Sequence, residues 1–370
     1  MAFLIRCPTD ASSEDGASAG GLIVLQKLAL LVCSSLLVLL VGEALLRWLD
    51  LAPSRDVYSV TAEQFRSIPG IYAPGQDFIS REMPALPHHV TINDLGYRGR
   101  GFPILKPRDE VRVLMAGDSM TYGDFVDNDD TLPSQLEALL QETCPNARVI
   151  NAGLRGGTIV GEAALVERGL ELNPDLVVLV FHENDVTDLS DPLWPQLEEN
   201  RRLKSRFPLR MVYPILRETA VWNLALRVAA RLRAERTAQI EPGRRDERGA
   251  GDRVVLDALK EQYADHLHKL HRLLADRGTR FVFVTFPGHQ AFDGAEFQAG
   301  LVEWAYQTAR LQDIPSFNLL SSMRDSGESK TALYLLPHDG HPSARGHAVA
   351  ARALHGWLLE LEALRDRCRA

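Results

Sequence analysis

The chain has 370 residues, of which 45% are hydrophobic and 24% are charged, and its formal net charge is −8. This length exceeds one minimal domain, so we expect one main domain with additions, in a chain of ordinary globular composition. The negative charge argues against nucleic acid as a partner, because phosphate binding requires clustered Lys and Arg.

The N-terminal residues predict a tail followed by a membrane anchor. Residues 1–20 are rich in Ser, Ala, Gly and acidic side chains, which favours a disordered tail. In residues 21–49 the uncharged run after Lys27 is short for a membrane span, but the apolar residues before it make the segment long enough. Lys27 can extend to the headgroups, and Trp48 suits the far interface. We therefore predict a single-pass transmembrane helix over 21–49.

Two other interpretations of this segment remain open. A cleavable signal peptide is disfavoured because no small-residue cleavage site follows the apolar run. A buried helix of a soluble protein is the second alternative. Orientation is not encoded by charge, because Arg6 and Lys27 precede the apolar core while Arg47 and Arg55 follow it.

Residues 50–110 contain Pro and Gly but few long apolar runs. Within them, the sequence INDLGYRG has turn chemistry at Asn93, Asp94 and Gly96. We expect this segment to be an N-terminal extension that packs on the edge of the main domain.

From residue 111 onward, short apolar runs alternate with segments of helical periodicity. The expected strands are residues 111–117, 147–153, 175–185, 279–287 and 314–320, and the expected helices are residues 132–143, 158–172, 254–275, 295–311 and 343–364. Such alternation predicts an α/β domain over 111–370, with a parallel sheet covered by helices on both faces.

Residues 189–252 interrupt this alternation. The segment contains Trp194, Trp222 and an expected helix at 218–233, and it ends in a charged, Gly-containing loop. Because an insertion here follows a strand end, a lid or substrate-recognition element is one interpretation. A surface excursion without such a role is the other.

The four cysteines are Cys7, Cys33, Cys144 and Cys368. None has metal-ligand spacing, and no C-x-x-C occurs. Cys144 and Cys368 could pair in an oxidising compartment, but we expect free thiols. The chain also lacks H-E-x-x-H and P-loop motifs, so we expect no metal site and no cofactor.

Polar residues collect after each expected strand. The sequences are GDSMTYG (117–123), NAGLRGGT (151–158), HEND (182–185), PGHQ (287–290) and LPHDGHPSARGH (336–347). In a doubly wound sheet, ligands bind beyond the carboxyl ends of the strands. These five blocks should therefore lie around one site.

In these blocks, and over about 111–364, the chain resembles the SGNH/GDSL hydrolase family. INDLGYRG also resembles a segment of membrane-anchored bacterial members. The resemblance implies a flavodoxin-like, three-layer α/β/α fold with a five-stranded parallel sheet, and ester hydrolysis or acyl transfer. It aligns Ser119 with the nucleophile, Gly156 and Asn184 with oxyanion-hole donors, His341 with the base, and a nearby acid with its partner.

These assignments have physical reasons of their own. A serine hydroxyl needs an adjacent base, which His341 would supply. The Ser119 and Gly156 backbone N–H groups and the Asn184 amide would stabilise the oxyanion. The family places its acid three residues before the base, where this chain has His338. We therefore assign Asp339, with a backbone carbonyl as the alternative.

The remaining candidates are substrate contacts. His182 and Glu183 stand where the family commonly has Gly before the Asn, and we expect them, with Arg155 and His289, to contact substrate. The leading hypothesis is a serine esterase that acts outside the cytoplasm on an O-acyl group, with O-acetyl favoured, of a carbohydrate or lipid-linked substrate. The alternatives are an O-acyltransferase with the same triad and a non-catalytic polysaccharide-assembly protein.

Overall fold

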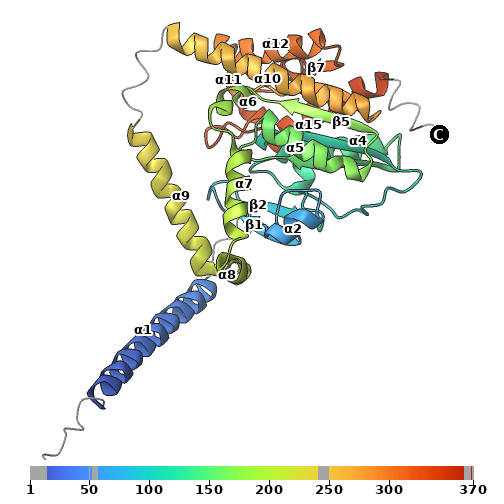
Figure 1. Ribbon diagram of the computed structural model, residues 1–370. Coiled ribbons are helices and arrows are strands. Elements are labelled where there is room, and N and C mark those ends of the chain that lie inside the picture. Colours follow the sequence, from blue (N-terminus) through green and yellow to red (C-terminus); the bar gives the residue numbers. More distant parts are fainter. Residues whose placement is uncertain (1–14, 50, 52–56, 241–249, 362–367, 369–370) are drawn as a thin grey trace, which may run out of the picture. The chain divides into compact units, whose positions relative to one another are not determined.

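Figure 1 shows the protein as a computed structural model, which describes residues 15–49, 51, 57–240, 250–361 and 368. These residues fall into two compact units. The first unit is Met1–Arg55 with Ile215–Arg236, and the second is Asp56–Pro214 with Thr237–Ala370. The second unit contains the sheet and all residues expected to take part in catalysis.

Five parallel strands form the central sheet of the second unit. They are β3 (Val111–Gly117), β4 (Ala147–Gly153), β5 (Leu176–Phe181), β6 (Arg280–Thr285) and β7 (Ser316–Asn318). Their order is β4-β3-β5-β6-β7, and every neighbouring pair is parallel. This is the flavodoxin-like strand order. The predicted five-stranded parallel sheet is therefore confirmed.

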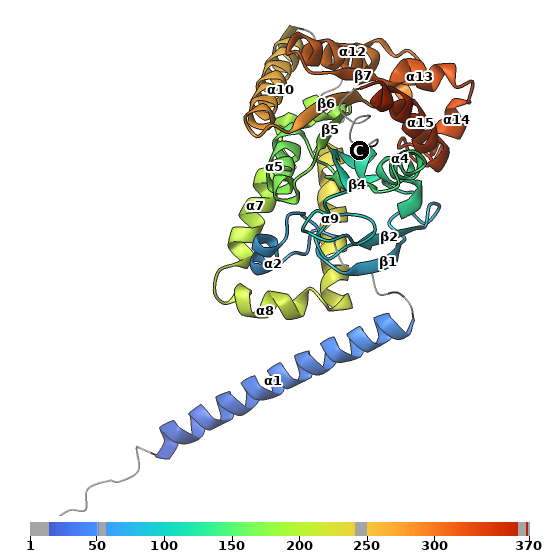
Figure 2. The same cartoon turned by 90° about the vertical axis from the view of Figure 1, so that its right-hand side faces the viewer.

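Helices cover both faces of this sheet. One layer consists of α5 (Ile159–Gly169), α10 (Ala250–Asp276) and α12 (Glu296–Leu311), and the other of α4 (Leu132–Gln141), α13 (Leu319–Asp325) and α15 (Ala344–Glu360). Figure 2 shows α5 and α10 on one side of the strands and α4 and α15 on the other. Side chains alternate accordingly: Leu114 and Ala116 of β3 face the first layer, and Val113 and Met115 face the second.

Short helical turns lie in the connections between the longer elements. They are α3 (Ser119–Tyr122), η1 (Asn128–Asp130), η2 (Leu170–Leu172), α6 (Asn184–Thr187), η3 (Asp188–Ser190), α11 (His289–Phe292) and α14 (Lys330–Leu333). Three strands end earlier than expected, β5 at Phe181, β6 at Thr285 and β7 at Asn318, and hydrogen bonds in the following turns account for two of these ends. The Asp185 carboxylate accepts the His182 N–H where β5 stops, and Asn318 accepts the Leu320 N–H to begin α13.

The N-terminal extension forms α2 (Ala62–Ser67) and an antiparallel pair, β1 (Gln76–Ser80) and β2 (His88–Ile92). It lies beside edge strand β4. Arg98 forms an isolated antiparallel bridge with Asn151, and the Tyr72 hydroxyl donates to the Gly153 carbonyl at 2.7 Å. These contacts bring the extension to the carboxyl end of the sheet.

Three helices follow η3, where we expected an insertion. They are α7 (Leu193–Lys204), α8 (Leu209–Leu216) and α9 (Ala220–Ile240). The helix expected at 218–233 corresponds to α9. Of the charged loop, residues 241–249 lie outside the described residues.

Helix α1 (Asp15–Trp48) begins before residue 21, so the last part of the segment expected to be a disordered tail is helical. A formed helix extends readily over adjacent Ala and Ser, and an acidic first residue suits its N-terminus. Residues 1–14 lie outside the described part. Within α1, Val24–Trp48 is apolar and 25 residues long. At about 1.5 Å per residue, that is enough to cross a hydrocarbon core of about 30 Å.

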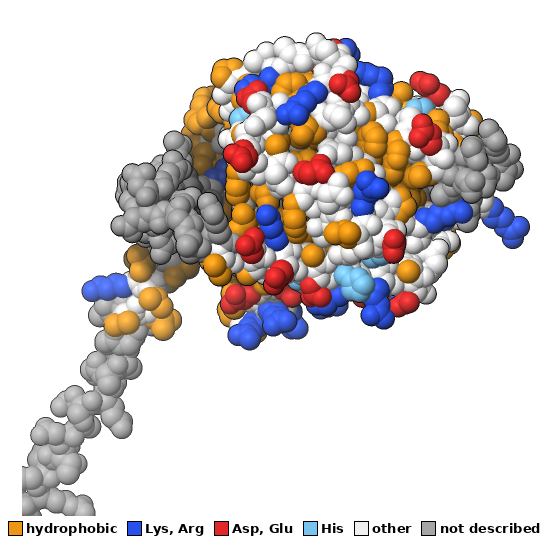
Figure 3. Space-filling view, turned by 90° about the horizontal axis from the view of Figure 1, so that it is seen from above, with side chains coloured by type: hydrophobic (Ala, Val, Ile, Leu, Met, Phe, Trp, Pro, Cys, Tyr) orange, Lys and Arg blue, Asp and Glu red, His pale blue; other side chains and the backbone are white. Residues whose placement is uncertain are grey.

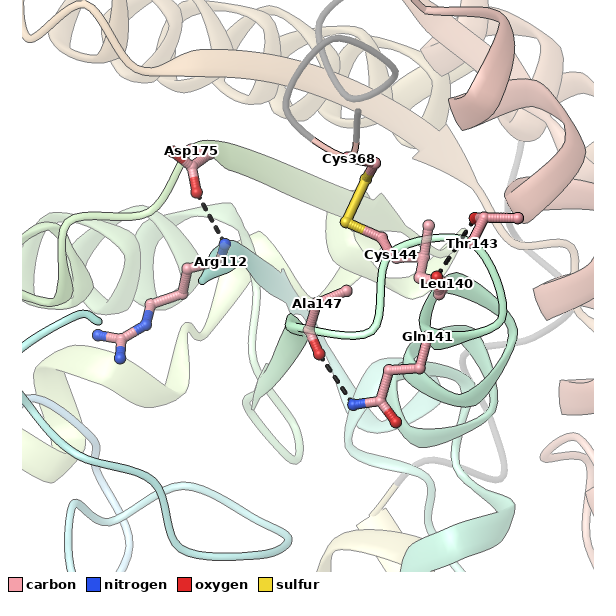
Figure 4. Close-up of a disulfide and its surroundings, with 8 residues drawn as sticks. All are labelled: Arg112, Leu140, Gln141, Thr143, Cys144, Ala147, Asp175 and Cys368. Atoms are coloured by element: carbon pink, nitrogen blue, oxygen red, sulfur yellow. Dashed lines mark hydrogen bonds between the residues drawn. A yellow bond between two sulfur atoms is a disulfide. The ribbon is translucent and has the colours of Figure 1, made fainter. Parts of the chain in front are cut away.

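A disulfide joins Cys144 and Cys368, so the expectation of free thiols is wrong for this pair (Figure 4). Cys144 lies in the turn between α4 and β4, and Cys368 comes from the C-terminal end of the chain. Their Cα atoms are 4.8 Å apart, within the range that a disulfide can bridge. Sequence separation concealed this proximity. Cys33 is a free, exposed cysteine.

Candidate active site

Ser119 is the first residue of α3, directly after β3. The turn between them requires close main-chain packing, because a Cβ on Gly117 would lie 2.6 Å from the Val180 carbonyl oxygen. Asp118 caps α3 by accepting the Met120 N–H at 2.9 Å. The strand end and this cap fix Ser119 at the carboxyl edge of the sheet.

His341 meets Ser119 from the segment before α15. Its Nε2 lies 2.8 Å from Ser119 Oγ, although 222 positions separate the two residues. On the other side of the ring, Nδ1 is hydrogen-bonded to Asp339 Oδ1, and that oxygen also accepts the His341 backbone N–H at 2.8 Å. The two-residue spacing therefore brings the carboxylate to the far ring nitrogen. His338, at the usual position of the acid, is exposed.

The electrostatics of this trio favour a charged imidazole. Burial alone would lower the pKa of His341, but the hydrogen bond that its ring donates to Asp339 and the nearby charge of Asp124 raise it. Burial would raise the pKa of Asp339, but its hydrogen bonds with His341 hold it below the usual range. An imidazolium formed when Ser119 gives up its proton would be stabilised here.

A cavity of about 340 Å³ opens beside His341. Its lining includes Met120, His182, Asn184, His289, Asp339 and His341. These residues come from the segments after β3, β5, β6 and β7, as the strand-end blocks predicted. The structure therefore gathers four of the five blocks around one space.

His182 and Glu183 are paired with each other in this wall, with His182 Nδ1 2.5 Å from Glu183 Oε2. The Glu183 carboxylate also accepts the Gly288 N–H at 2.9 and 3.0 Å, which links the ends of β5 and β6. Burial would lower the pKa of His182, but the Glu183 charge raises it to about 9. Both residues line the cavity, but the Glu183 carboxylate is occupied by these internal partners.

The predicted oxyanion donors include the Asn184 side chain and the Gly156 backbone N–H. Asn184 begins α6 and lines the cavity, where its Nδ2 lies 3.3 Å from Asp188 Oδ2. Gly156 has φ +66, a left-handed conformation that favours glycine. Three residues earlier, Gly153 packs its Cα against the backbone of α3, the helix that begins with Ser119. The set of three oxyanion donors, the Ser119 and Gly156 N–H groups and the Asn184 amide, stays a prediction.

Arg155 and His289 have different surroundings. Arg155 forms ion pairs with Asp124 at 2.6 Å and Glu82 at 2.7 Å. His289 lines the cavity, with its ring 6.2 Å from that of Tyr334. Of these two, His289 has the freer access to a substrate.

The sequence did not identify two residues that support the site. Buried Arg98 donates to the Tyr122 and Val126 carbonyls and so holds the loop that follows Ser119. Phe125 has φ 65, unusual for an aromatic residue, and its ring lies 5.5 Å from that of His341. Arg98 lies in INDLGYRG, the segment that resembles membrane-anchored family members, so that resemblance was the signal that could have identified it.

Residues 115–349, well over half of the chain, match the GDSL-like lipase/acylhydrolase family. The chain belongs to that family. It is accordingly a serine hydrolase that acts on ester bonds, and its sheet is the GDSL-type fold. Among the described residues of this GDSL-like hydrolase, no group of three or more His, Cys, Asp and Glu side chains could hold a metal ion.

Several solved structures are similar to this GDSL-like hydrolase at low identity. LAE5, an alpha/beta hydrolase enzyme from the metagenome of Lake Arreo, is 16% identical over 66% of this chain and 94% of its own, with TM-score 0.42. A lipolytic protein of the G-D-S-L family from Desulfitobacterium hafniense is 13% identical over 67% and 99%, with TM-score 0.40. Axe2, an acetylxylan esterase from Geobacillus stearothermophilus, is 17% identical over 67% and 94%, with TM-score 0.39. A search of curated proteins found no match.

Proposed function

We propose that this hydrolase is a membrane-anchored esterase that removes an O-acyl group, with O-acetyl favoured, from a carbohydrate or lipid-linked substrate. Ser119 is the nucleophile, His341 the general base, and Asp339 the acid that orients it. The observation that carries this proposal is the continuous chain of contacts from Ser119 Oγ through both ring nitrogens of His341 to Asp339.

The reaction proceeds in two halves. Ser119 Oγ attacks the acyl carbon while its proton moves to His341 Nε2, which then protonates the departing alcohol. The acyl group is left as an ester on Ser119. Water next attacks this ester, His341 takes a proton from the water and returns it to Ser119, and the carboxylic acid leaves.

Negative charge develops on the acyl oxygen in both halves. In this proposal the Ser119 and Gly156 backbone N–H groups and the Asn184 amide hydrogen-bond that oxygen. Loss of one such donor costs about 3–4 kcal/mol of transition-state stabilisation.

The cavity supports a small acyl group on a polar carrier. Its volume is about 340 Å³, and His289, Gln290 and Gln298 bring side chains that can bond sugar hydroxyls. A long acyl chain would call for a more extended apolar lining.

One feature supports attachment to a membrane, and another supports a location outside the cytoplasm. Helix α1 is long and apolar enough to anchor the chain. The Cys144–Cys368 disulfide is of a kind that persists in oxidising compartments. We infer a single-pass protein with its catalytic domain on the extracytoplasmic, and in a double-membrane bacterium periplasmic, side.

Labelling with a fluorophosphonate probe tests the nucleophile. The full chain should be labelled, Ser119→Ala should not, and Ser321→Ala, which removes an exposed hydroxyl on α13, should behave as the full chain does. Release of free acetate from an acetylated glycan would then support hydrolysis. Transfer of the acetyl group to a second sugar without free acetate would favour the acyltransferase, and a folded wild type that is never labelled would refute the enzyme.

A further inference from the structure

Helix α8 presents apolar side chains to solvent. Only Tyr213 of this helix is buried. Phe207, just before α8, is 79% exposed, Met211 65% and Ile215 69%, and these residues recur every fourth position. Leu209 and Val212 are exposed as well. We call these five residues the α8 surface. Single exposed apolar residues are ordinary, but a contiguous group marks a contact site.

The segment around the α8 surface is strongly basic. Residues 201–217 contain five Arg, one Lys and no Asp or Glu, within a chain whose net charge is −8. Arg206 and Arg210, which flank Phe207 and Leu209, are exposed. The face seen in Figure 3 differs, because acidic and basic side chains are interspersed there. Apolar and basic residues together suit a binding surface that has both apolar and negatively charged groups, as the interface of an anionic membrane does.

The chain directly after α8 is fastened to α1, within the first unit. The Glu43 carboxylate accepts the N–H groups of Ala220 at 2.9 Å and Val221 at 3.0 Å, and so caps α9. Arg47 donates to the Glu218 carbonyl at 2.9 Å. These contacts involve the C-terminal end of the apolar stretch, which finishes at Trp48.

Chain continuity then constrains the depth of the C-terminal end of α8, which belongs to the first unit. The helix ends at Leu216, two positions before Glu218. Two residues span at most about 7 Å. If α1 crosses a bilayer, the end of α8 must lie near the level at which α1 leaves it. Amphipathic helices bind in that interfacial layer.

We propose that the α8 surface inserts into the interfacial layer of a bilayer that contains anionic phospholipids, on the leaflet from which the C-terminal end of α1 emerges. This inference rests on the membrane anchor of the proposed function. Phe207, Met211 and Ile215 enter the acyl boundary, while Arg206 and Arg210 bind lipid phosphates. The contact gives the catalytic domain a second attachment to the membrane, in addition to α1.

The full chain in lipid nanodiscs tests this directly. An environment-sensitive fluorophore is attached to Met211→Cys in a background with Cys7→Ser and Cys33→Ser, which keeps the disulfide. Leu311→Cys, at an 86% exposed position ending α12, is the matched control. In discs with phosphatidylglycerol, the probe at 211 should shift its emission to shorter wavelength and be quenched by spin-labelled lipids. The probe at 311 should do neither.

The charge contribution has its own comparison. Arg206→Glu with Arg210→Glu should reduce the quenching at 211, as should discs of phosphatidylcholine alone. Quenching that is equal in both lipids and in both variants would overturn the anionic-lipid proposal. An emission shift without lipid quenching would indicate burial against protein, such as a second copy, and would also overturn it.

The two membrane proposals fail in distinguishable ways. If alkaline carbonate extracts the full chain from membranes, the anchor is wrong, and the α8 proposal falls with it. If the chain remains in the membrane while the probe at 211 stays as water-exposed as the probe at 311, only the α8 proposal is overturned.

Discussion

Replacing Asp339 with Asn should impair the base without disturbing the fold. The Asp339 carboxylate accepts hydrogen bonds from both the His341 ring and its backbone N–H. A hydrogen bond to a charged group contributes about 1.5–3 kcal/mol, which corresponds to a rate loss of about 10- to 150-fold. An amide can also turn its NH₂ toward the ring and favour the wrong tautomer, which extends the loss toward about 10⁴-fold.

The same change should move the pH profile. His341 must be neutral to act as base, so activity rises as pH increases through its pKa, which Asp339 helps to raise. In Asp339→Asn the rising limb should therefore shift to lower pH, toward the ordinary value of histidine. Hydrolysis of p-nitrophenyl acetate, measured at a series of pH values around neutrality, gives both the rate and the pH at which activity rises.

His338→Ala is the matched control, because His338 occupies the family's usual acid position but is exposed. It should retain activity within about two-fold, since an exposed side chain away from the reacting atoms contributes little. Wild-type rates and an unmoved limb in Asp339→Asn would refute the assigned triad acid. A large loss of activity in His338→Ala, without one in Asp339→Asn, would show that Asp339 is not the residue that supports His341.

Three further changes test the scaffold. Arg98→Lys should lower the free energy of unfolding in urea by about 2–4 kcal/mol, because one ammonium cannot replace the guanidinium bonds to carbonyls such as that of Val126; an unchanged midpoint would contradict this. Burial raises the pKa of Glu162 well above its usual value, so its contribution to stability is full below the unfolded-state pKa and is lost as pH rises through the folded-state pKa. The thermal midpoint of the wild type should therefore fall as pH rises, and Glu162→Gln should reduce that fall. Parallel plots of midpoint against pH for the two proteins would contradict this. Cys144→Ser should cost about 2–5 kcal/mol by opening the loop to Cys368, whereas Cys33→Ser should leave stability unchanged.

The order of apolar runs was enough to predict the sheet. VRVLMAG, ARVINAG and the run before HEND are short, apolar and bounded by polar turns, so each forms a strand for local reasons. Because parallel strands end at one edge, the sequence also predicted that the blocks holding Ser119 and His341 would meet there. The 2.8 Å contact between them agrees with that geometric expectation.

Other features depended on contacts between segments far apart in the chain. Cys144 and Cys368 pair because the C-terminal end returns to the turn before β4, which no local pattern records. Glu183 proved to be held by His182 and the Gly288 N–H, because β5 and β6 end side by side.

Periodicity is a property of neighbouring residues, and therefore it can be read from the sequence alone. The disulfide partner of Cys144 and the Gly288 N–H that Glu183 accepts are decided by distances of a few ångström between segments that are remote in the chain. Those distances exist only once the chain has folded, and hydrogen bonds and disulfides form only at such short separations.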